Sequence, residues 1–213
     1  MKLLLTSAGI TNESLAASLE ELVGKERRET KIGFVPTAGN VEVGNKDWFI
    51  GQLTNLHKFG FNWIDVVDIS APGVDWKGRL GEVDVVFVSG GNTFHLLDQV
   101  RKAGFGTWLK ENLSRLVYVG SSAGSIITTP SIAICNVPPA DVNVPGISDF
   151  TGMKLVDFEM SPHSPRIVTY EDNEKYASTL SHTLYAIDDQ TGIEVIDGKF
   201  KVISEGAWKK MGE

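Results

Sequence analysis

The 213-residue sequence has a single cysteine and no long apolar run. Cys135 cannot form a disulfide within the chain, and a lone cysteine excludes a cysteine-rich zinc site. The apolar stretch 3–5 is too short for a signal peptide, and no segment approaches the roughly 18 apolar residues of a membrane span. We therefore expect a cytoplasmic protein without a membrane partner.

The sequence also has no excess of positive charge. It contains 20 Lys and Arg residues against 27 Asp and Glu residues, which gives a net charge of −7. Because a protein binds a phosphate backbone through clustered basic side chains, we do not expect nucleic acid as a partner. No repeat, low-complexity tract or linker-like segment divides the chain, so residues 1–213 are predicted to form one domain. Nothing in the sequence implies a cofactor or a metal.

Short apolar runs alternate with longer segments of helical period, a pattern typical of βαβ units. The predicted fold class is α/β, with a mainly parallel sheet and helices on both faces. We expect strands over residues 2–6, 31–36, 62–68, 83–89, 116–120, 154–160 and 183–188. We expect helices, several of them beginning at an asparagine N-cap, over residues 12–23, 45–59, 92–103, 106–114 and 171–180.

The C-terminal residues 192–203 follow a different pattern. Apolar and polar residues alternate on both sides of Asp197-Gly198. This dipeptide favours the tight turn that joins two antiparallel strands. We therefore predict a C-terminal β-hairpin.

A Gly-x-Ser-x-Gly pattern directly follows the apolar run 116–119. Gly120 and Gly124 flank Ser122, and the next few residues could form one or two helical turns. At a sharp strand-to-helix turn the glycines avoid steric clashes, and the serine hydroxyl can project into a cleft. Ser122 is therefore the candidate nucleophile.

A serine hydroxyl needs a neighbouring base to take its proton, and the sequence has four histidines. His57 and His95 fall within predicted helices, and His182 precedes a predicted strand. His163 follows the predicted strand 154–160, and prolines on both sides restrict its backbone. Ligands of parallel sheets bind at the carboxyl ends of strands, so we expect His163 to be the base.

An oxyanion hole requires two backbone N–H groups aimed at the developing negative charge. The residue after the nucleophile, Ala123, is one candidate donor, and Gly91 in the Gly90-Gly91 pair is the other. The pair could instead only form a tight turn before the helix that Asn92 caps. We also consider Asn92 a candidate contact for the substrate.

A carboxylate is expected to accept a hydrogen bond from the second ring nitrogen of the base. Asp188 and Asp189 follow the predicted strand that ends at residue 187, again at a carboxyl end. Asp141 lies in the loop after the serine turn. The residues alone leave the choice among these three open.

Together these segments resemble the serine peptidase family that contains dipeptidase E (aspartyl dipeptidase) and cyanophycinase. The resemblance covers most of the chain and rests on LLLTS (3–7), FVPTA (34–38), VFVSGGNTF (86–94), YVGSSAG (118–124) and SPH (161–163). It implies a flavodoxin-like fold similar to class I glutamine amidotransferases, and cofactor-free hydrolysis of small peptides. By position it implies Ser122 as nucleophile, His163 as base, and Gly91 and Ala123 as oxyanion donors.

The chain departs from this family at two places. The triad acid of dipeptidase E resembles a glutamate that follows a late strand, and Asp189 aligns with it. A second acidic residue of dipeptidase E would fall near Val137, so in this chain only the nearby Asp141 could replace it. The arginine segment that resembles a reader of the substrate's aspartate is replaced by residues 164–170. Within them, Arg166 is a candidate partner for a substrate carboxylate. The resemblance therefore implies a small-peptide peptidase without strong aspartate specificity.

Two alternatives stay open at this stage. A family member that has lost its triad acid would be a catalytically impaired small-molecule binding protein. A glutamine amidotransferase-like enzyme is disfavoured, because those enzymes use a cysteine at the serine turn, whereas Cys135 lies well after it.

Overall fold

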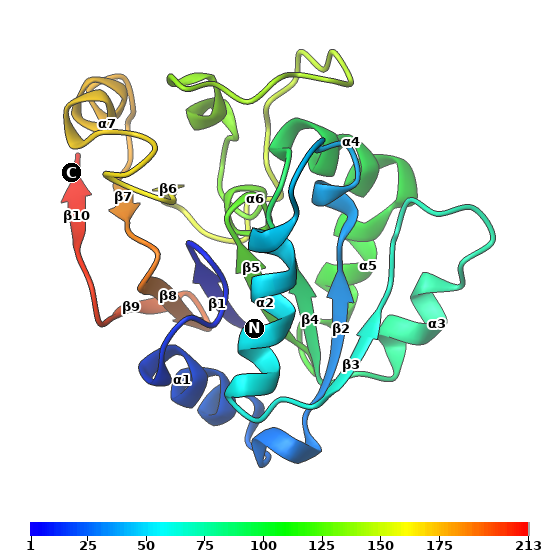
Figure 1. Cartoon of the computed structure of the whole chain (residues 1–213). Coiled ribbons are helices and arrows are strands. Elements are labelled where there is room, and N and C mark those ends of the chain that lie inside the picture. The colour runs from blue at the N-terminus through cyan, green and yellow to red at the C-terminus, as the bar shows by residue number, and fades with distance from the viewer. Residues whose placement is uncertain (213) are drawn as a thin grey trace.

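The computed structural model of the chain describes residues 1–212. A seven-stranded sheet forms its centre (Figure 1). The strands, in spatial order, are β3 (Trp63–Val66), β2 (Lys31–Val35), β4 (Val85–Val88), β5 (Val117–Ser121), β1 (Lys2–Thr6), β8 (Thr191–Ile196) and β9 (Lys199–Ser204). The first five are parallel, β8 pairs antiparallel with β1, and β9 pairs antiparallel with β8.

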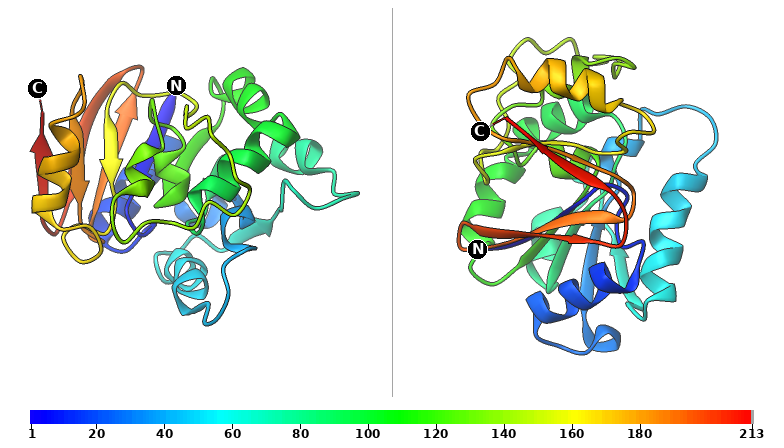
Figure 2. Two further views of the ribbon diagram at one scale, coloured as in Figure 1. Left: turned by 90° about the horizontal axis from the view of Figure 1, so that it is seen from above. Right: turned by 90° about the vertical axis from the view of Figure 1, so that its left-hand side faces the viewer.

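Helices cover both faces of this sheet (Figure 2). On one face α1 (Glu13–Val23) and α2 (Asp47–Lys58) contribute to a core cluster with β2 and β4. On the other face lie α3 (Trp76–Gly81), α4 (Thr93–Ala103) and α5 (Phe105–Asn112). The predicted α/β fold with a mainly parallel sheet is therefore confirmed.

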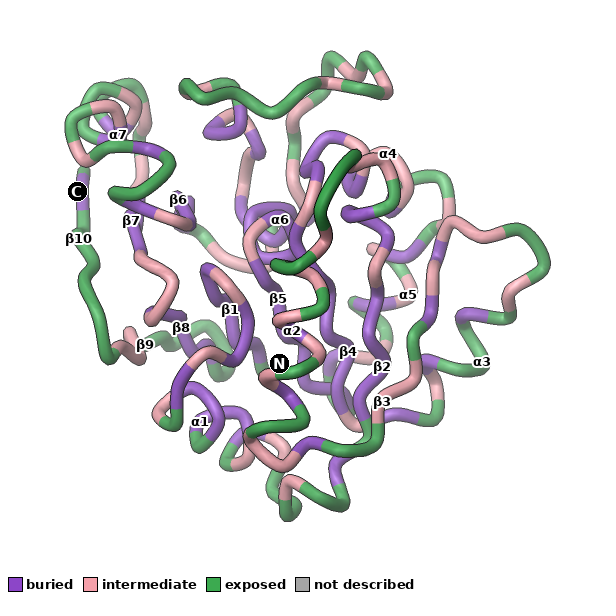
Figure 3. The backbone as a smooth tube through the Cα atoms, viewed as in Figure 1, coloured by how far each residue is buried: buried purple, intermediate pink, exposed green. Residues whose placement is uncertain are grey.

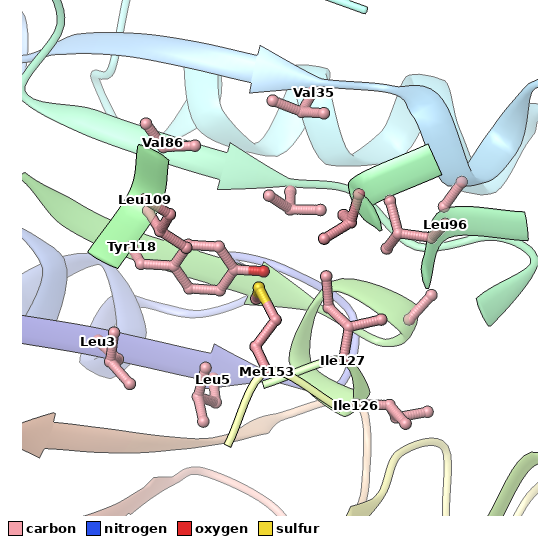
Figure 4. Packing of buried hydrophobic residues seen from close by; sticks show 14 of the residues in the cluster. Leu3, Leu5, Val35, Val86, Leu96, Leu109, Tyr118, Ile126, Ile127 and Met153 are labelled. Atoms are coloured by element: carbon pink, nitrogen blue, oxygen red, sulfur yellow. The ribbon is translucent and has the colours of Figure 1, made fainter. Parts of the chain in front are cut away.

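The central strands are mostly apolar because both of their faces are buried. Along β1, Leu3 and Leu5 join the core cluster of α4 and α5, whereas Leu4 joins that of α1 and α2. Figure 4 shows Leu3 and Leu5 near Tyr118, whose ring lies in the first cluster. The buried Tyr118 hydroxyl donates a 2.6 Å hydrogen bond to Gly124 O, so the core is fixed to the turn that follows β5.

The predicted C-terminal hairpin is also confirmed. β8 and β9 pair antiparallel, with Ile196 opposite Lys199. The turn residues Asp197 and Gly198 have φ values of 48° and 81°, the positive values that an Asp-Gly hairpin turn requires. Edge strand β9 is mostly exposed or half-buried, in contrast to β1 and β5 (Figure 3).

Three of the strands after Ser122 do not join the main sheet, and the expectation that residues 154–160 and 183–188 would contribute strands to it was wrong. β6 (Glu159–Ser161) and β7 (Leu184–Ile187) pair with β10 (Trp208–Met211) in a separate three-stranded sheet beside α7 (Tyr170–Ala177). The place next to β1 is taken by β8, so the main sheet has no open edge there for β6 or β7. Residues 154–158 are irregular, and β6 is correspondingly short.

Several short elements complete the described chain. One four-residue helix, α6 (Ala123–Ile126), follows β5, and the 3₁₀ turns are η1 (Arg27–Glu29), η2 (Thr37–Gly39) and η3 (Ala133–Asn136). The asparagine caps at Asn12 and Asn92 are present, each accepting a backbone N–H from three residues further on. Within residues 1–212, every helix is too short or too polar to cross a bilayer.

Candidate active site

Ser122 lies in a strained turn between β5 and α6. Its φ of 49° and ψ of −111° lie in a region that non-glycine residues rarely occupy. A Cβ on Gly124 would come within 2.2 Å of Val88 O, so only glycine fits there. The N–H of Ser122 donates to Thr6 O at 3.0 Å. This packing explains the Gly-x-Ser-x-Gly spacing and fixes the direction of the serine side chain.

His163 follows β6 in the second sheet, yet its ring reaches Ser122. The distance from His163 Nε2 to Ser122 Oγ is 3.0 Å. The backbone of His163 is fixed on both sides, since its N–H donates to Ser7 Oγ at 2.8 Å and its C=O accepts from Ile167 N–H at 2.8 Å. The predicted pairing of His163 with Ser122 is therefore present, although it forms between two sheets instead of along one sheet edge.

Asp189 contacts the opposite side of the same imidazole ring. His163 Nδ1–H donates a short hydrogen bond to Asp189 Oδ1. With its proton on Nδ1, the ring has a free acceptor at Nε2 for the hydroxyl proton of Ser122. The three side chains thus form a continuous chain of hydrogen bonds from hydroxyl to carboxylate.

The other two candidate acids make different contacts. Asp188 accepts hydrogen bonds from Gln190 N–H and the Thr191 hydroxyl with one oxygen, and from Ala207 N–H with the other. Asp141 accepts a 3.3 Å hydrogen bond from Thr93 N–H, and burial raises the pKa of its carboxyl. Neither is hydrogen-bonded to His163, so the geometry favours Asp189.

The carboxyl of Asp189 is stabilised in its charged form. Burial by itself raises its pKa, but the hydrogen bond and charge of His163, together with hydrogen bonds from Ser7 and Arg166, outweigh burial. The resulting pKa lies well below the usual range for aspartate. Asp189 is therefore a carboxylate at neutral pH, as a group that orients an imidazole must be.

Arg166 makes a contact with Asp189 that the sequence did not predict. Its Nη2 donates to Asp189 Oδ2 at 2.9 Å, while 64% of its side chain remains exposed. The guanidinium also borders the cleft in front of Ser122. The guanidinium of Arg166 is thus already paired with the carboxylate of Asp189, which makes it a weaker candidate for binding a substrate carboxylate.

The two backbone N–H groups predicted to form the oxyanion hole have no hydrogen-bond acceptor within residues 1–212. Ala123 is the first residue of α6, where an N–H has no acceptor within the helix. Gly91 has a φ of 131°, and a Cβ there would lie 2.4 Å from Ala38 O, so only glycine fits. Among residues 1–212 no hydrogen bond is formed by the N–H of Gly91. Gly91 also lines the cleft in front of Ser122.

Asn92 does not lie in the cleft, contrary to its expected contact with substrate. Its side chain is buried, its oxygen caps α4 by accepting from His95 N–H, and its nitrogen donates to Val142 O at 2.8 Å. Both ends of the amide are used within the protein. Asn92 is therefore a structural cap.

A cleft of about 540 Å³ opens in front of Ser122. Its walls come from the loops after β1, β4, β5, β6 and β7 and from α2. Besides the residues described above, its lining includes Thr11, Glu42, Trp48, Gln52, Asn55 and Ile167. Within residues 1–212, no cluster of His, Cys, Asp and Glu side chains is arranged to hold a metal.

Two residues of the site were missed by sequence reasoning. Ser7 follows β1, and because β1 runs parallel to β5, its end lies at the same sheet edge as Ser122. Gln52 lies in α2 four residues before the buried Leu56, on the same face of the helix. A polar residue on this buried face was the sequence signal that could have indicated a role for Gln52.

Comparison with known proteins shows similarity to peptidases. Residues 3–203 match the model of peptidase family S51. An uncharacterized peptidase of Pasteurella multocida is 30% identical over 176 residues, covering 81% of this chain and 84% of that protein. Peptidase E of Streptomyces coelicolor is 36% identical over 155 residues, covering 70% of this chain and 57% of that protein.

Solved structures support the same fold. A crystal structure from Listeria monocytogenes EGD-e, described as a candidate peptidase E, superposes with a TM-score of 0.81 at 23% identity, covering 96% of this chain and 98% of that one. A peptidase from an acI-B1 Actinobacterium gives a TM-score of 0.62 at 17% identity, covering 99% and 93%. With the family match spanning residues 3–203, the chain belongs to peptidase family S51 and is a serine-type peptidase.

Proposed function

We propose that this peptidase hydrolyses small peptides through a triad in which Ser122 is the nucleophile, His163 the general base and Asp189 the orienting acid. The observation that carries the proposal is the pair of contacts on the His163 ring. Nε2 lies 3.0 Å from Ser122 Oγ, and Nδ1–H donates to the Asp189 carboxylate. This arrangement has the hydrogen-bond order that an activated serine needs.

In the proposed reaction, Ser122 Oγ attacks the carbonyl carbon of the scissile amide while its proton passes to His163 Nε2. The carbonyl oxygen becomes an oxyanion, which the N–H groups of Gly91 and Ala123 stabilise. His163 then donates the proton to the leaving amine, and the C–N bond breaks. Water, deprotonated by His163, hydrolyses the acyl-serine and restores the hydroxyl.

The size of the cleft supports a small substrate. A volume of about 540 Å³ falls within the range of small-molecule sites and accommodates a few residues of a peptide. The runner-up function, a catalytically impaired binding protein, depended on the loss of the triad acid. The contact of Asp189 with His163 favours the enzyme over the binding protein.

The proposal also includes specificity. Arg166 is paired with Asp189, and Glu42 brings a carboxylate to the cleft lining, so the site offers little unpaired positive charge to an acidic side chain. Strong discrimination arises when the wrong substrate leaves polar groups of the site unpaired. We therefore expect at most a weak preference for aspartate at the cleaved bond.

A screen of dipeptides and short peptides tests this function. The purified protein should hydrolyse at least one uncharged or basic class, and Ser122→Ala should abolish that hydrolysis. No hydrolysis of any peptide by the folded wild type would contradict the peptidase proposal. Cleavage of aspartyl dipeptides more than about a hundredfold faster than alanyl ones would contradict the proposed specificity alone.

Two broader expectations remain part of the proposal. Residues of both sheets share one hydrophobic cluster, among them Leu3, Met160 and Tyr185, which supports a single domain. The lone, unpaired Cys135 supports a reducing compartment such as the cytoplasm.

A further inference from the structure

Gln52 is buried in the wall of the cleft without a hydrogen-bond partner for its carboxamide. It is 6% exposed and lies with Leu56 on the buried face of α2. Its Oε1 is fully buried, and among residues 1–212 no group pairs with it. Buried amides are nearly always hydrogen-bonded, because an unpaired one has lost water without a replacement. The exception here lies in the candidate active site.

The carboxamide lies next to the nucleophile. A Cβ built on Gly90 would be 3.1 Å from Ser122 Cβ and 3.7 Å from Gln52 Nε2, so the two side chains flank the same glycine. A second unpaired polar atom, Ser121 Oγ, is buried nearby. A Cβ on Gly9 would meet both Gln52 Cγ, at 3.5 Å, and Ser121 Oγ, at 3.8 Å.

The accessible end of the amide is its donor. Oε1 has no contact with solvent. Nε2 also has no hydrogen-bond partner within residues 1–212, but it is not among the fully buried unpaired atoms, so it is accessible. The residue lines the same cleft as Ser122 and Gly91. Nε2 therefore presents its N–H groups to the cleft on the side of the Gly90-Gly91 turn.

We infer that Gln52 is a catalytic residue that donates a hydrogen bond from Nε2 to the carbonyl oxygen of the scissile amide. The donation strengthens as this oxygen becomes an oxyanion, and it adds a side-chain donor to the N–H groups of Gly91 and Ala123. Gln52 neither gains nor loses a proton in the reaction. This inference rests on the proposed serine hydrolysis and names a further residue for it.

The rate of covalent labelling by a fluorophosphonate measures this role without a known substrate. Ser122 Oγ would displace fluoride, and the phosphonyl oxygen would occupy the oxyanion hole. Gln52→Met keeps the size of the side chain and removes the donor. Its labelling rate constant should fall by about 10² to 10³, as for the loss of a side-chain oxyanion donor elsewhere. The melting temperature should stay the same or rise, because an unpaired buried amide has been replaced by an apolar group.

Two further variants make the test selective. Gln52→Glu keeps the shape but places a carboxylate beside the oxyanion, so it should be labelled even more slowly than Gln52→Met. Thr54→Ala, which changes an exposed residue of α2 outside the cleft lining, should be labelled at close to the wild-type rate.

Wild-type labelling rates in both Gln52 variants would overturn the inference. A lower melting temperature in Gln52→Met, with a normal rate in Gln52→Glu, would also overturn it and indicate a purely structural amide. Failure of the proposed function gives a different result. In that case wild type is not labelled, or Ser122→Ala is labelled as fast as wild type.

Discussion

Ser7 Oγ donates a 2.9 Å hydrogen bond to Asp189 Oδ1 and accepts the backbone N–H of His163 at 2.8 Å. One hydroxyl at the end of β1 is therefore bonded both to the proposed acid and to the backbone of the proposed base. The next loop residues reinforce this link, since the Thr11 hydroxyl donates to Asp189 O at 2.7 Å. The β1–α1 loop thus connects the main sheet to both residues that come from the second sheet.

Ser7→Ala should lower kcat without changing KM much, because Ser7 positions Asp189 and His163 and is not in the cleft lining. A hydrogen bond to a charged group contributes about 1.5–3 kcal/mol, which corresponds to roughly ten- to a hundredfold in rate if it is all lost in the transition state. Steady-state kinetics on an active peptide would measure the change.

Ser18→Ala is the matched control for Ser7→Ala. Ser18 is another buried serine, and its hydroxyl donates to the carboxylate of Glu194 at 2.7 Å without touching the triad. Both variants should lose some stability, but kcat should fall only in Ser7→Ala. Equal kcat losses would show that Ser7 acts only through general stability.

Asp189→Asn should lower turnover steeply, whereas Asp141→Asn should have a mild effect. By analogy with the aspartate of other serine triads, the first loss is about 10⁴ in kcat, because an amide favours the wrong histidine tautomer. Asp141 accepts a bond from the Thr93 backbone and makes none to His163. The reverse ranking of the two kcat values would move the acid to the loop after Ser122.

The low pKa of Asp189 predicts a specific pH dependence of stability. Its carboxyl is deprotonated in the folded state at pH values where the unfolded chain already binds a proton. The stability that Asp189 contributes is therefore fully present above the ordinary aspartate pKa of about 3.9, and it is lost as pH falls through the lower folded-state pKa. Urea unfolding between about pH 5 and 2.5 should show a smaller slope of unfolding free energy against pH for Asp189→Asn than for wild type. Identical slopes would contradict the charged, hydrogen-bonded state of Asp189.

Cys135 should be unreactive in the folded protein. It is 8% exposed, and burial raises the pKa of its thiol, so little of the reactive thiolate exists near neutral pH. Iodoacetamide should modify Cys135 slowly in native protein and rapidly in guanidinium chloride. Fast native modification together with loss of peptidase activity would point to cysteine chemistry of the kind used by glutamine amidotransferases.

The main sheet was largely predictable because its strands are buried on both faces. Continuous apolar runs such as Leu3–Leu5 have no other stable location, and Asp197-Gly198 specifies a hairpin turn locally. The three-stranded sheet was not predictable, because a strand's own residues do not encode which neighbour it pairs with. Two short elements, α3 with its Gly78 and β10 with its Lys209 and Lys210, carry little periodic signal and were missed.

Within the site, predictability followed local geometry. Ser122 could be predicted as the nucleophile because its turn needs glycines at fixed spacing, and His163 as the base because it directly follows a predicted strand. The choice of Asp189 over Asp188 depends on which of two adjacent carboxylates faces the ring, and side chains alternate direction in extended chain. Such a choice requires coordinates. The resemblance to class I glutamine amidotransferases stays a prediction.

The central claim, that Ser122 is the activated nucleophile, is tested most directly by locating the covalent adduct of a fluorophosphonate. Intact-mass measurement after brief treatment should show one added phosphonyl group, and peptide mapping should assign it to Ser122. The adduct should be absent from Ser122→Ala, and it should form much more slowly in a variant with His163 replaced by alanine. A folded wild-type protein without an adduct, or an adduct on Ser121 or Ser125, would contradict the account.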